Sequence, residues 1–201
     1  MDFLTPDERG IARVVELLRA GEVVGFPTDT VYGLAGLAAH PRAVRRVFEV
    51  KGRSLSRPLI LMVAEPEQLE LWAHVDDRAR DYMRRWWPGP LTLVLPAREG
   101  VGPPLTGGRP RTIAARIPDH DVALALLRET REALATTSAN RSGEPPALTP
   151  LETAWVVGLA AVLDGGRAPG AVPSTLLDLS SEEPRVLRPG PVPAEALVPS
   201  G

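Results

Sequence analysis

Three short polar segments of the chain carry most of the side chains that could do chemistry. Residues 27–34 combine two threonine hydroxyls, a carboxylate and a phenol, and residues 51–58 combine three cations with small residues. Residues 136–143 form a run of hydroxyl, amide and guanidinium groups. Cations beside small, amide-exposing residues suit the oxygens of a phosphate group. The residues alone therefore indicate an enzyme or binder of a phosphorylated or nucleotide ligand, with ordinary solvated turns as the alternative.

Two rare residue types fall inside these segments. The chain holds 22 arginines but one lysine, Lys51, and it holds one asparagine, Asn140. A lysine ammonium is a compact point charge and an arginine guanidinium is a planar fork, so the two are not interchangeable at a binding site. Because both lone residues lie in polar segments, we interpret them as functional rather than as chance survivors. The scarcity of Asn, Gln and Cys beside 22 prolines is also typical of a heat-adapted protein or of a GC-rich genome.

The charge of the chain is unevenly distributed. Residues 42–57 hold six bases against one acid, a local charge of +5 in a chain whose net charge is −2. A solvated helix face is the usual explanation of such a run. However, Gly52, Ser54 and Ser56 make the loop at its end small enough to hold phosphate oxygens. The net charge argues against a protein that binds nucleic acid through a globally basic body.

Several kinds of site are excluded by what the sequence lacks. Without cysteine there are no disulfides, thiolate metal sites or cysteine nucleophiles. No P-loop, G-x-G-x-x-G or G-x-S-x-G pattern occurs. His40, His74 and His120 match no metal spacing, so we expect cap or surface roles for them and no protein metal site. No apolar run approaches the ~20 residues of a membrane span, and the N-terminal residues are acidic where a secretory signal is basic. We therefore expect a soluble, cytoplasmic protein with no membrane attachment.

The elements that must position the polar segments alternate between strands and helices, which predicts a single α/β domain over residues 1–190. We expect a twisted, open sheet of mixed direction flanked by helices, with ligands bound at the loops that follow its strands. The Pro-rich residues 191–201 are expected to form a loosely held tail. Strands are predicted at 22–27, 59–63, 91–95, 112–117, 134–137, 161–163, 175–179 and 185–187. Helices are predicted from a capping box at 5–8 to Gly21, from His40 onward, at 67–72, 77–87 and 122–130, and at 154–159 after a second capping box.

The same segments resemble a known family, the YrdC-type threonylcarbamoyl-AMP synthases. The resemblance rests first on residues 27–34, on the K-x-R of Lys51 and Arg53, on residues 87–92, and on the S-x-N of Ser138 and Asn140. It continues in residues 112–118, 164–166, 173–175 and 187–190, so it runs in order from about residue 10 to 190. Each motif is weak alone, but their succession is highly specific.

The resemblance implies a fold and a reaction. The fold is a twisted α/β sheet with a concave, positively charged cavity, here in a short form without the additional C-terminal domain of longer members. The reaction is nucleotidyl transfer, in which L-threonine, bicarbonate and ATP give L-threonylcarbamoyladenylate and pyrophosphate. Mg²⁺ is expected to be carried by the ATP. The product is expected to pass to the machinery that modifies the adenosine beside the anticodon of tRNA.

The resemblance also implies roles for individual residues. Lys51 and Arg53 are expected to be the catalytic cations on the triphosphate, assisted by Arg57 and Arg188. The remaining nucleotide contacts are expected from Thr112, Ser138 and Asn140. The threonine carboxylate is expected to bind Arg116, and the other polar groups of threonine are expected to bind Thr28 and Ser174.

The chain departs from the residues frequent in the family at Ser54, Arg57 and Met62, which bears on the fine contacts of phosphate and threonine. Two other functions are left open at this point. One is a non-catalytic RNA-binding module, with weak RNA binding through the basic residues 42–57, although few aromatics are near enough in sequence to stack on bases. The other is a carbamoyl-transfer domain like those of hydrogenase-maturation proteins, which are embedded in much longer chains.

Overall fold

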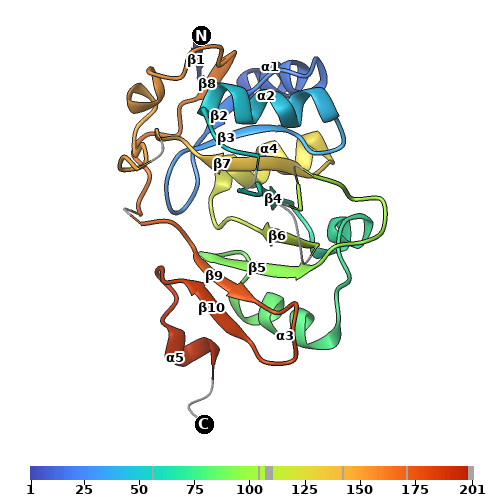
Figure 1. Ribbon diagram of the computed structural model, residues 1–201. Coiled ribbons are helices and arrows are strands. Elements are labelled where there is room, and N and C mark those ends of the chain that lie inside the picture. The colour runs from blue at the N-terminus through green and yellow to red at the C-terminus, as the bar shows by residue number, and fades with distance from the viewer. Residues whose placement is uncertain (56, 104, 107–110, 142, 171, 199–201) are drawn as a thin grey trace.

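The computed structural model describes residues 1–55, 57–103, 105–106, 111–141, 143–170 and 172–198 (Figure 1). Its strands are β1 (Asp2–Leu4), β2 (Val24–Phe26), β3 (Gly33–Leu37), β4 (Ile60–Met62), β5 (Leu91–Pro96), β6 (Thr112–Arg116), β7 (Leu134–Ser138), β8 (Ala161–Leu163), β9 (Thr175–Asp178) and β10 (Arg185–Arg188). Its α-helices are α1 (Glu8–Arg19), α2 (Pro41–Lys51), α3 (Asp77–Trp86), α4 (Asp121–Thr130) and α5 (Ala194–Leu197), and its 3-10 helices are η1 (Pro66–Leu71) and η2 (Leu151–Thr153).

The strands in this part of the chain form one open sheet, in the order β1-β8-β2-β3-β7-β4-β6-β5-β9-β10. The pairs β1–β8, β2–β8, β4–β6 and β5–β9 are parallel, and the other neighbours are antiparallel. The predicted mixed, open sheet flanked by helices is therefore confirmed. Within the ranges given above, no helix is both long enough and apolar enough to cross a membrane.

Different helices cover the two faces of the sheet (Figure 1). Val14 of α1 and Leu127 of α4 share a hydrophobic cluster with Ala35 of β3, whereas Val44 of α2 shares a separate cluster with Leu34. Leu34 and Ala35 are adjacent in β3, and successive side chains of a strand point to opposite faces. We therefore distinguish an α1/α4 face, which bears Ala35, and an α2 face, which bears Leu34.

The register of the central strands decides which polar side chains share a face. Arg116 of β6 lies opposite Met62 of β4, and Met62 belongs to the cluster of the α1/α4 face. Ile60, two residues earlier in β4, lies opposite Thr136 of β7. Because period-2 alternation keeps these residues on one side, Arg116 and Thr136 project from the same face.

Side chains cap the first turns of α1 and α2, but the residue that caps α1 differs from the predicted one. α1 begins at Glu8 because the Asp7 carboxylate accepts a hydrogen bond from the Gly10 N–H at 2.8 Å. The expected cap, Thr5, instead donates its hydroxyl to Asp7 at 3.0 Å. At the start of α2, the Nδ1 of His40 accepts the Ala43 N–H at 3.3 Å, so the cap role expected of this histidine is confirmed.

Two predicted helical segments differ from the structure. The segment 154–159 forms no α-helix; a single 3-10 turn, η2, precedes it. The Glu152 side chain accepts a hydrogen bond from the Leu148 N–H at 2.6 Å, before the expected cap. Gly158 then takes a left-handed φ of 86°, which no helix continues. The segment near 67–72 is helical but of the 3-10 type.

The strand β3 was not predicted, because its sequence Gly-Leu-Ala-Gly-Leu has weak strand propensity. Its Gly36 is explained by packing, since a Cβ there would lie 3.1 Å from the backbone oxygen of Ala43 in α2. The helix therefore approaches the strand closely. The edge strand β1 was also missed.

The C-terminal segment is packed against the domain, so the expectation of a loosely held tail is wrong for residues 191–198. Val192 and Leu197 are each 2% exposed. The hydroxyl of Tyr82 in α3 donates a hydrogen bond to the Leu197 carbonyl at 2.5 Å. Apolar residues among the prolines provide this anchoring, while residues 199–201 lie outside the described residues.

Candidate functional site

A small cavity of about 80 Å³ opens on the sheet where the predicted polar segments meet. Three guanidinium groups from separate parts of the chain line it, those of Arg53, Arg116 and Arg188. Hydroxyl groups of Thr30, Thr136 and Ser174 also contribute. No acidic residue is among the lining residues in the described ranges. The cavity therefore favours an anionic, hydrogen-bonding ligand.

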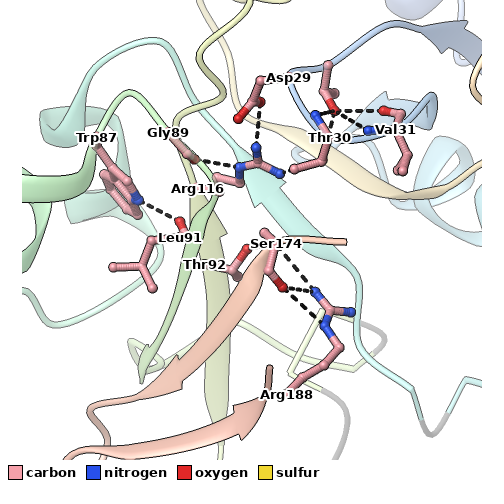
Figure 2. A network of polar contacts seen from close by, with 11 residues as sticks. Asp29, Thr30, Val31, Trp87, Gly89, Leu91, Thr92, Arg116, Ser174 and Arg188 are labelled. Atoms are coloured by element: carbon pink, nitrogen blue, oxygen red, sulfur yellow. Dashed lines mark hydrogen bonds and ion pairs between the residues drawn. The ribbon is translucent and has the colours of Figure 1, made fainter. Parts of the chain in front are cut away.

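Arg116 is held at the end of β6 with 2% of its surface exposed. Its Nε donates to the Gly89 carbonyl at 2.8 Å, its Nη1 to the Thr30 hydroxyl at 3.0 Å, and its Nη2 to Asp29 Oδ1 at 2.5 Å (Figure 2). Burial lowers the pKa of Arg116, and the charge of Asp29 opposes that shift. A guanidinium has five N–H groups, and the described residues accept three of them, so two have no partner within this part of the chain and could bind a ligand carboxylate.

The loop before β3 owes its shape to Thr28, which is 1% exposed. Its hydroxyl donates to the Val31 carbonyl at 2.6 Å and accepts the N–H groups of Thr30 and Val31, each at 3.2 Å. The single hydroxyl proton of Thr28 is thus engaged within the loop. Thr28 lines the cavity, but its bonds make it a loop-forming residue that aims Thr30 at Arg116.

Ser174 and Arg188 form the opposite wall of the cavity (Figure 2). The Nε and Nη2 of Arg188 donate to the Ser174 carbonyl at 3.2 and 2.8 Å. The hydroxyl groups of Ser174 and Thr92 share a hydrogen bond of 2.7 Å. Burial lowers the pKa of Arg188. This wall therefore joins β5, the start of β9 and the end of β10.

Lys51 connects the K-x-R and S-x-N motifs directly. It is 5% exposed, and its Nζ donates to the Ser138 carbonyl and to Asn140 Oδ1, the latter at 2.6 Å. The Ser138 hydroxyl donates to the same Asn140 oxygen at 2.6 Å. The two rare residues are therefore in contact, and the lysine fixes the loop after β7.

Burial lowers the pKa of Lys51 to about 8, with a further lowering from the charge of Arg53. Between this pKa and the ordinary value of 10.5, the unfolded chain binds a proton that the folded chain releases. The free energy of unfolding should therefore rise with pH through this range, since the cost of burying the ammonium disappears. Urea titrations at a series of pH values should show this rise in the wild type, and its loss in Lys51→Met. An identical pH dependence in both proteins would contradict the assignment.

Arg53 reaches the cavity from the loop after α2. Its Nε donates to the Arg57 carbonyl at 3.0 Å, its Nη2 to the Pro58 carbonyl at 3.1 Å, and its Nη1 to the Thr137 hydroxyl at 3.4 Å. Burial and then the charges of Arg57 and Arg188 lower the pKa of Arg53. The guanidinium groups therefore repel one another, so an anion placed among them would relieve that repulsion.

The structure brings most of the predicted site residues together. The cavity is lined by Thr28, Arg53, Arg116, Ser138, Ser174 and Arg188. Lys51 and Asn140 support it from behind through the bonds described above. Arg57 is exposed and contributes its carbonyl to Arg53, while Ser56 and Ser142 lie outside the described residues.

Thr112 is the exception among the predicted site residues. It begins β6 opposite Pro96, whereas Arg116 ends that strand at the cavity. Four residues of strand separate the two side chains by about 13 Å, at ~3.3 Å per residue. Thr112 therefore lies apart from the residues expected at threonine, and its expected contact with the nucleotide stays a prediction.

Sequence reasoning assigned no role to three residues that shape the site, Asp29, Thr30 and Thr92. Asp29 and Thr30 stood in a polar segment, but only the fold shows that they meet Arg116. Tyr32 also contributes, since its hydroxyl donates to the Gly166 carbonyl at 2.7 Å and accepts the Gly165 N–H at 3.2 Å. Burial raises the pKa of Tyr32 to about 12, so this phenol stays uncharged while its hydrogen bonds connect two loops.

The described residues do not form an evident set of ligands for a metal ion. Among the described residues, no group of three His, Asp or Glu side chains could hold a metal ion. His120 occupies the N-cap position of α4 without a capping hydrogen bond from its side chain. Burial lowers the pKa of His120.

Comparison with known proteins places this site in a family. A family model named Sua5_yciO_yrdC and described as telomere recombination matches residues 16–190. The chain belongs to the Sua5–YciO–YrdC family. This family therefore accounts for the resemblance seen in the motifs.

Relatives of the chain in this family include named synthases. The chain is 40% identical over 200 residues to the threonylcarbamoyl-AMP synthase of Bacillus subtilis, covering 98% of this chain and 58% of the relative. It is 37% identical to a putative threonylcarbamoyl-AMP synthase of Mycobacterium tuberculosis, covering 98% of this chain and 92% of that relative. The chain thus spans little more than half the length of the first curated relatives that it matches, at 58% and 54%.

Solved structures in the Sua5–YciO–YrdC family have the same fold. The Pyrococcus abyssi Sua5 structure complexed with L-threonine aligns with a TM-score of 0.91 and 39% identity, covering 98% of this chain and 59% of that chain. The Escherichia coli YciO structure aligns with a TM-score of 0.85 and 26% identity, covering 96% of this chain and 97% of that chain. The match therefore extends over nearly the whole of the YciO chain.

Proposed function

We propose that the protein makes L-threonylcarbamoyladenylate and pyrophosphate from L-threonine, bicarbonate and ATP. The observation that carries this proposal is Arg116, a buried guanidinium with two open N–H groups in a cavity lined by hydroxyls. That arrangement suits the carboxylate of a small hydroxylated amino acid. The named synthases among the relatives, and the threonine bound to a related Sua5, support the same substrate.

The size of the cavity supports a division between two ligands. At about 80 Å³, it is smaller than the ~300–1,000 Å³ of pockets that hold drug-sized ligands. It therefore suits an amino acid, while the nucleotide would lie across the mouth. There Arg53 and Ser138 line the cavity, with Lys51 and Asn140 behind them.

The chemistry requires positioning and charge stabilisation more than an acid or base. The threonine amine would attack the carbon of bicarbonate with loss of water, and a carbamate oxygen would then attack the α-phosphorus with loss of pyrophosphate. Arg53 and Arg188 would stabilise the negative charge that develops on the phosphoryl oxygens. Mg²⁺ would enter with ATP and neutralise its phosphates. The adenylate would pass to the enzymes that transfer the threonylcarbamoyl group to tRNA.

Mass spectrometry of reaction products tests the proposal directly. Purified protein with ATP, L-threonine and bicarbonate should give the mass of L-threonylcarbamoyladenylate together with pyrophosphate. Leaving out each substrate in turn should abolish both products. Release of pyrophosphate without threonine, or no adenylate with all three substrates, would refute the proposed reaction.

Substitution of three arginines in α2 would distinguish adenylate synthesis from RNA binding. Arg42, Arg45 and Arg46 line a hollow of about 500 Å³ that shares no lining residue with the cavity. Replacing all three by Ser should leave adenylate synthesis within about twofold of the wild type. Any RNA affinity should fall, and log K of the wild type should decrease with log salt by ~0.7 per phosphate neutralised on a single strand. Loss of synthesis with retained RNA affinity would contradict this division.

A further inference from the structure

Arg116 lines the cavity and forms an ion pair with Asp29, which lies directly behind it and is not itself a lining residue. The side chains of Arg116 and Asp29 are 2% and 12% exposed. Asp29 uses Oδ1 on Arg116 Nη2. Across the described ranges, no protein group donates a hydrogen bond to its other oxygen, Oδ2. Among the described residues, two N–H groups of Arg116 and one oxygen of Asp29 therefore have no hydrogen-bond partner.

An amino-acid ligand brings a positive charge into surroundings that repel it. At neutral pH the α-ammonium is charged, and the cavity is lined by Arg53, Arg116 and Arg188 without an acid. The charges of both Arg188 and Asp29 act on Arg116. An ammonium in this cavity needs a nearby carboxylate to offset the repulsion. Asp29 is not itself a lining residue, but its carboxylate is bonded to Arg116, which lines the cavity.

The chemistry of an α-amino acid matches the pair. Its ammonium and its carboxylate are bonded to the same carbon, so a carboxylate held by Arg116 keeps the ammonium close to the neighbours of Arg116. One of these neighbours is the Thr30 hydroxyl and another is the Asp29 carboxylate (Figure 2). Of the two, only Asp29 offers a compensating charge.

We propose that Asp29 binds the α-ammonium of the amino-acid substrate, so that Asp29 and Arg116 together select a zwitterion. This proposal rests on the amino-acid site of the proposed function. It adds a specificity-determining residue to that site, because a hydroxy acid of the same shape would lack the group that Asp29 binds.

A rival explanation gives Asp29 only the task of orienting Arg116. Under that explanation, loss of the Asp29 charge would weaken every carboxylate ligand alike. Under the present proposal, the loss depends on whether the ligand carries an ammonium. The two explanations are separated by L-threonine and 3-hydroxybutanoate, which is threonine without its amino group.

Calorimetric titration of both ligands into three proteins makes the comparison. Asp29→Asn keeps an oxygen for Arg116 but removes the charge. Asp119→Asn is the matched control, because the charge of Asp119 also acts on Arg116 without a direct bond. We expect Asp29→Asn to lose roughly tenfold to a hundredfold in threonine affinity, as for a charge-assisted hydrogen bond. Its affinity for 3-hydroxybutanoate should be unchanged or higher, and Asp119→Asn should resemble the wild type with both ligands.

The outcomes distinguish this inference from the proposed function. Equal loss for both ligands in Asp29→Asn would overturn the role of Asp29 and leave the synthase proposal standing. If the wild type bound another α-amino acid instead of threonine, with the same selective loss, the synthase proposal would fail and the zwitterion site would hold. Binding of neither ligand by the folded wild type would overturn both. If Asp29→Asn did not fold, Asp29→Glu would serve instead, and equal affinity of that variant for both ligands would refute the proposal.

Discussion

Replacing Arg116 by alanine should raise the KM for threonine by roughly tenfold to a hundredfold while changing the KM for ATP much less. Under the proposed function, the lost interaction would be a charge-assisted bond to the threonine carboxylate, worth about 1.5–3 kcal/mol. The KM for ATP should change less because the phosphates of ATP would contact Arg53 and Arg188 instead. Steady-state assays of pyrophosphate release, with each substrate varied in turn, measure both constants.

The same substitution should also destabilise the fold, which requires a control. Removing Arg116 leaves the Asp29 carboxylate without its cation, and breaking a buried ion pair typically costs about 3–5 kcal/mol. Thermal unfolding of Arg116→Ala should therefore be measured alongside the kinetics. Arg185→Ala is the matched control, since this β10 arginine is 74% exposed in its pair with Asp178. Equal increases in both KM values would assign Arg116 to a structural role or to the nucleotide.

Replacing Lys51 by alanine should nearly abolish pyrophosphate release and leave the sheet folded. The variant loses a positive charge behind the nucleotide region, and it also loses the bonds to the Ser138 carbonyl and Asn140 Oδ1 that fix the loop after β7. Because Asn140 also donates to the Glu144 carbonyl at 2.7 Å, the loop retains part of its support. Circular dichroism and a stopped assay of pyrophosphate would separate folding from activity.

The Lys51→Arg variant isolates the shape of the cation from its charge. The ammonium is enclosed, with 5% of the residue exposed, and a planar fork cannot place its donors on the same two oxygens without displacing the loop. Activity of this variant should fall clearly below the wild type. Full activity would show that the single lysine of the chain is interchangeable with arginine. The rarity of lysine in this chain would then carry no functional meaning.

The fold was predictable wherever side-chain pattern and burial agree. The apolar run around Leu61 predicted β4, and the periodic Val14 and Leu18 predicted α1. By contrast, β3 was hidden because its glycines are required by the close approach of α2, which is a tertiary cause. The helix expected at 154–159 is absent from the structure. The capping pattern before it does not reveal that a downstream glycine takes a left-handed conformation.

The site was predictable as a set of segments but not as a set of contacts. The segment of Ser138 follows a strand, where open sheets bind ligands, and the segment of Arg53 was expected at the same site from its cations and small residues. Pairing between Asp29 and Arg116 joins positions 87 residues apart, and no local pattern encodes it. Thr112 and Arg116 share a motif but lie at opposite ends of β6, so the motif alone does not tell how far apart they are.

The hairpin of β9 and β10 has a consequence for how the protein responds to a bound ligand. Ser174 immediately precedes β9, Arg188 ends β10, and β10 has a single neighbouring strand at the edge of the sheet. Edge elements open with lower free energies than central strands, so this wall of the cavity can exchange amide hydrogens while the core stays closed. A ligand that binds only the closed form raises the opening free energy by mass action. Substrate supply would thereby set how often residues 179–184, between the two strands, become accessible to a protease.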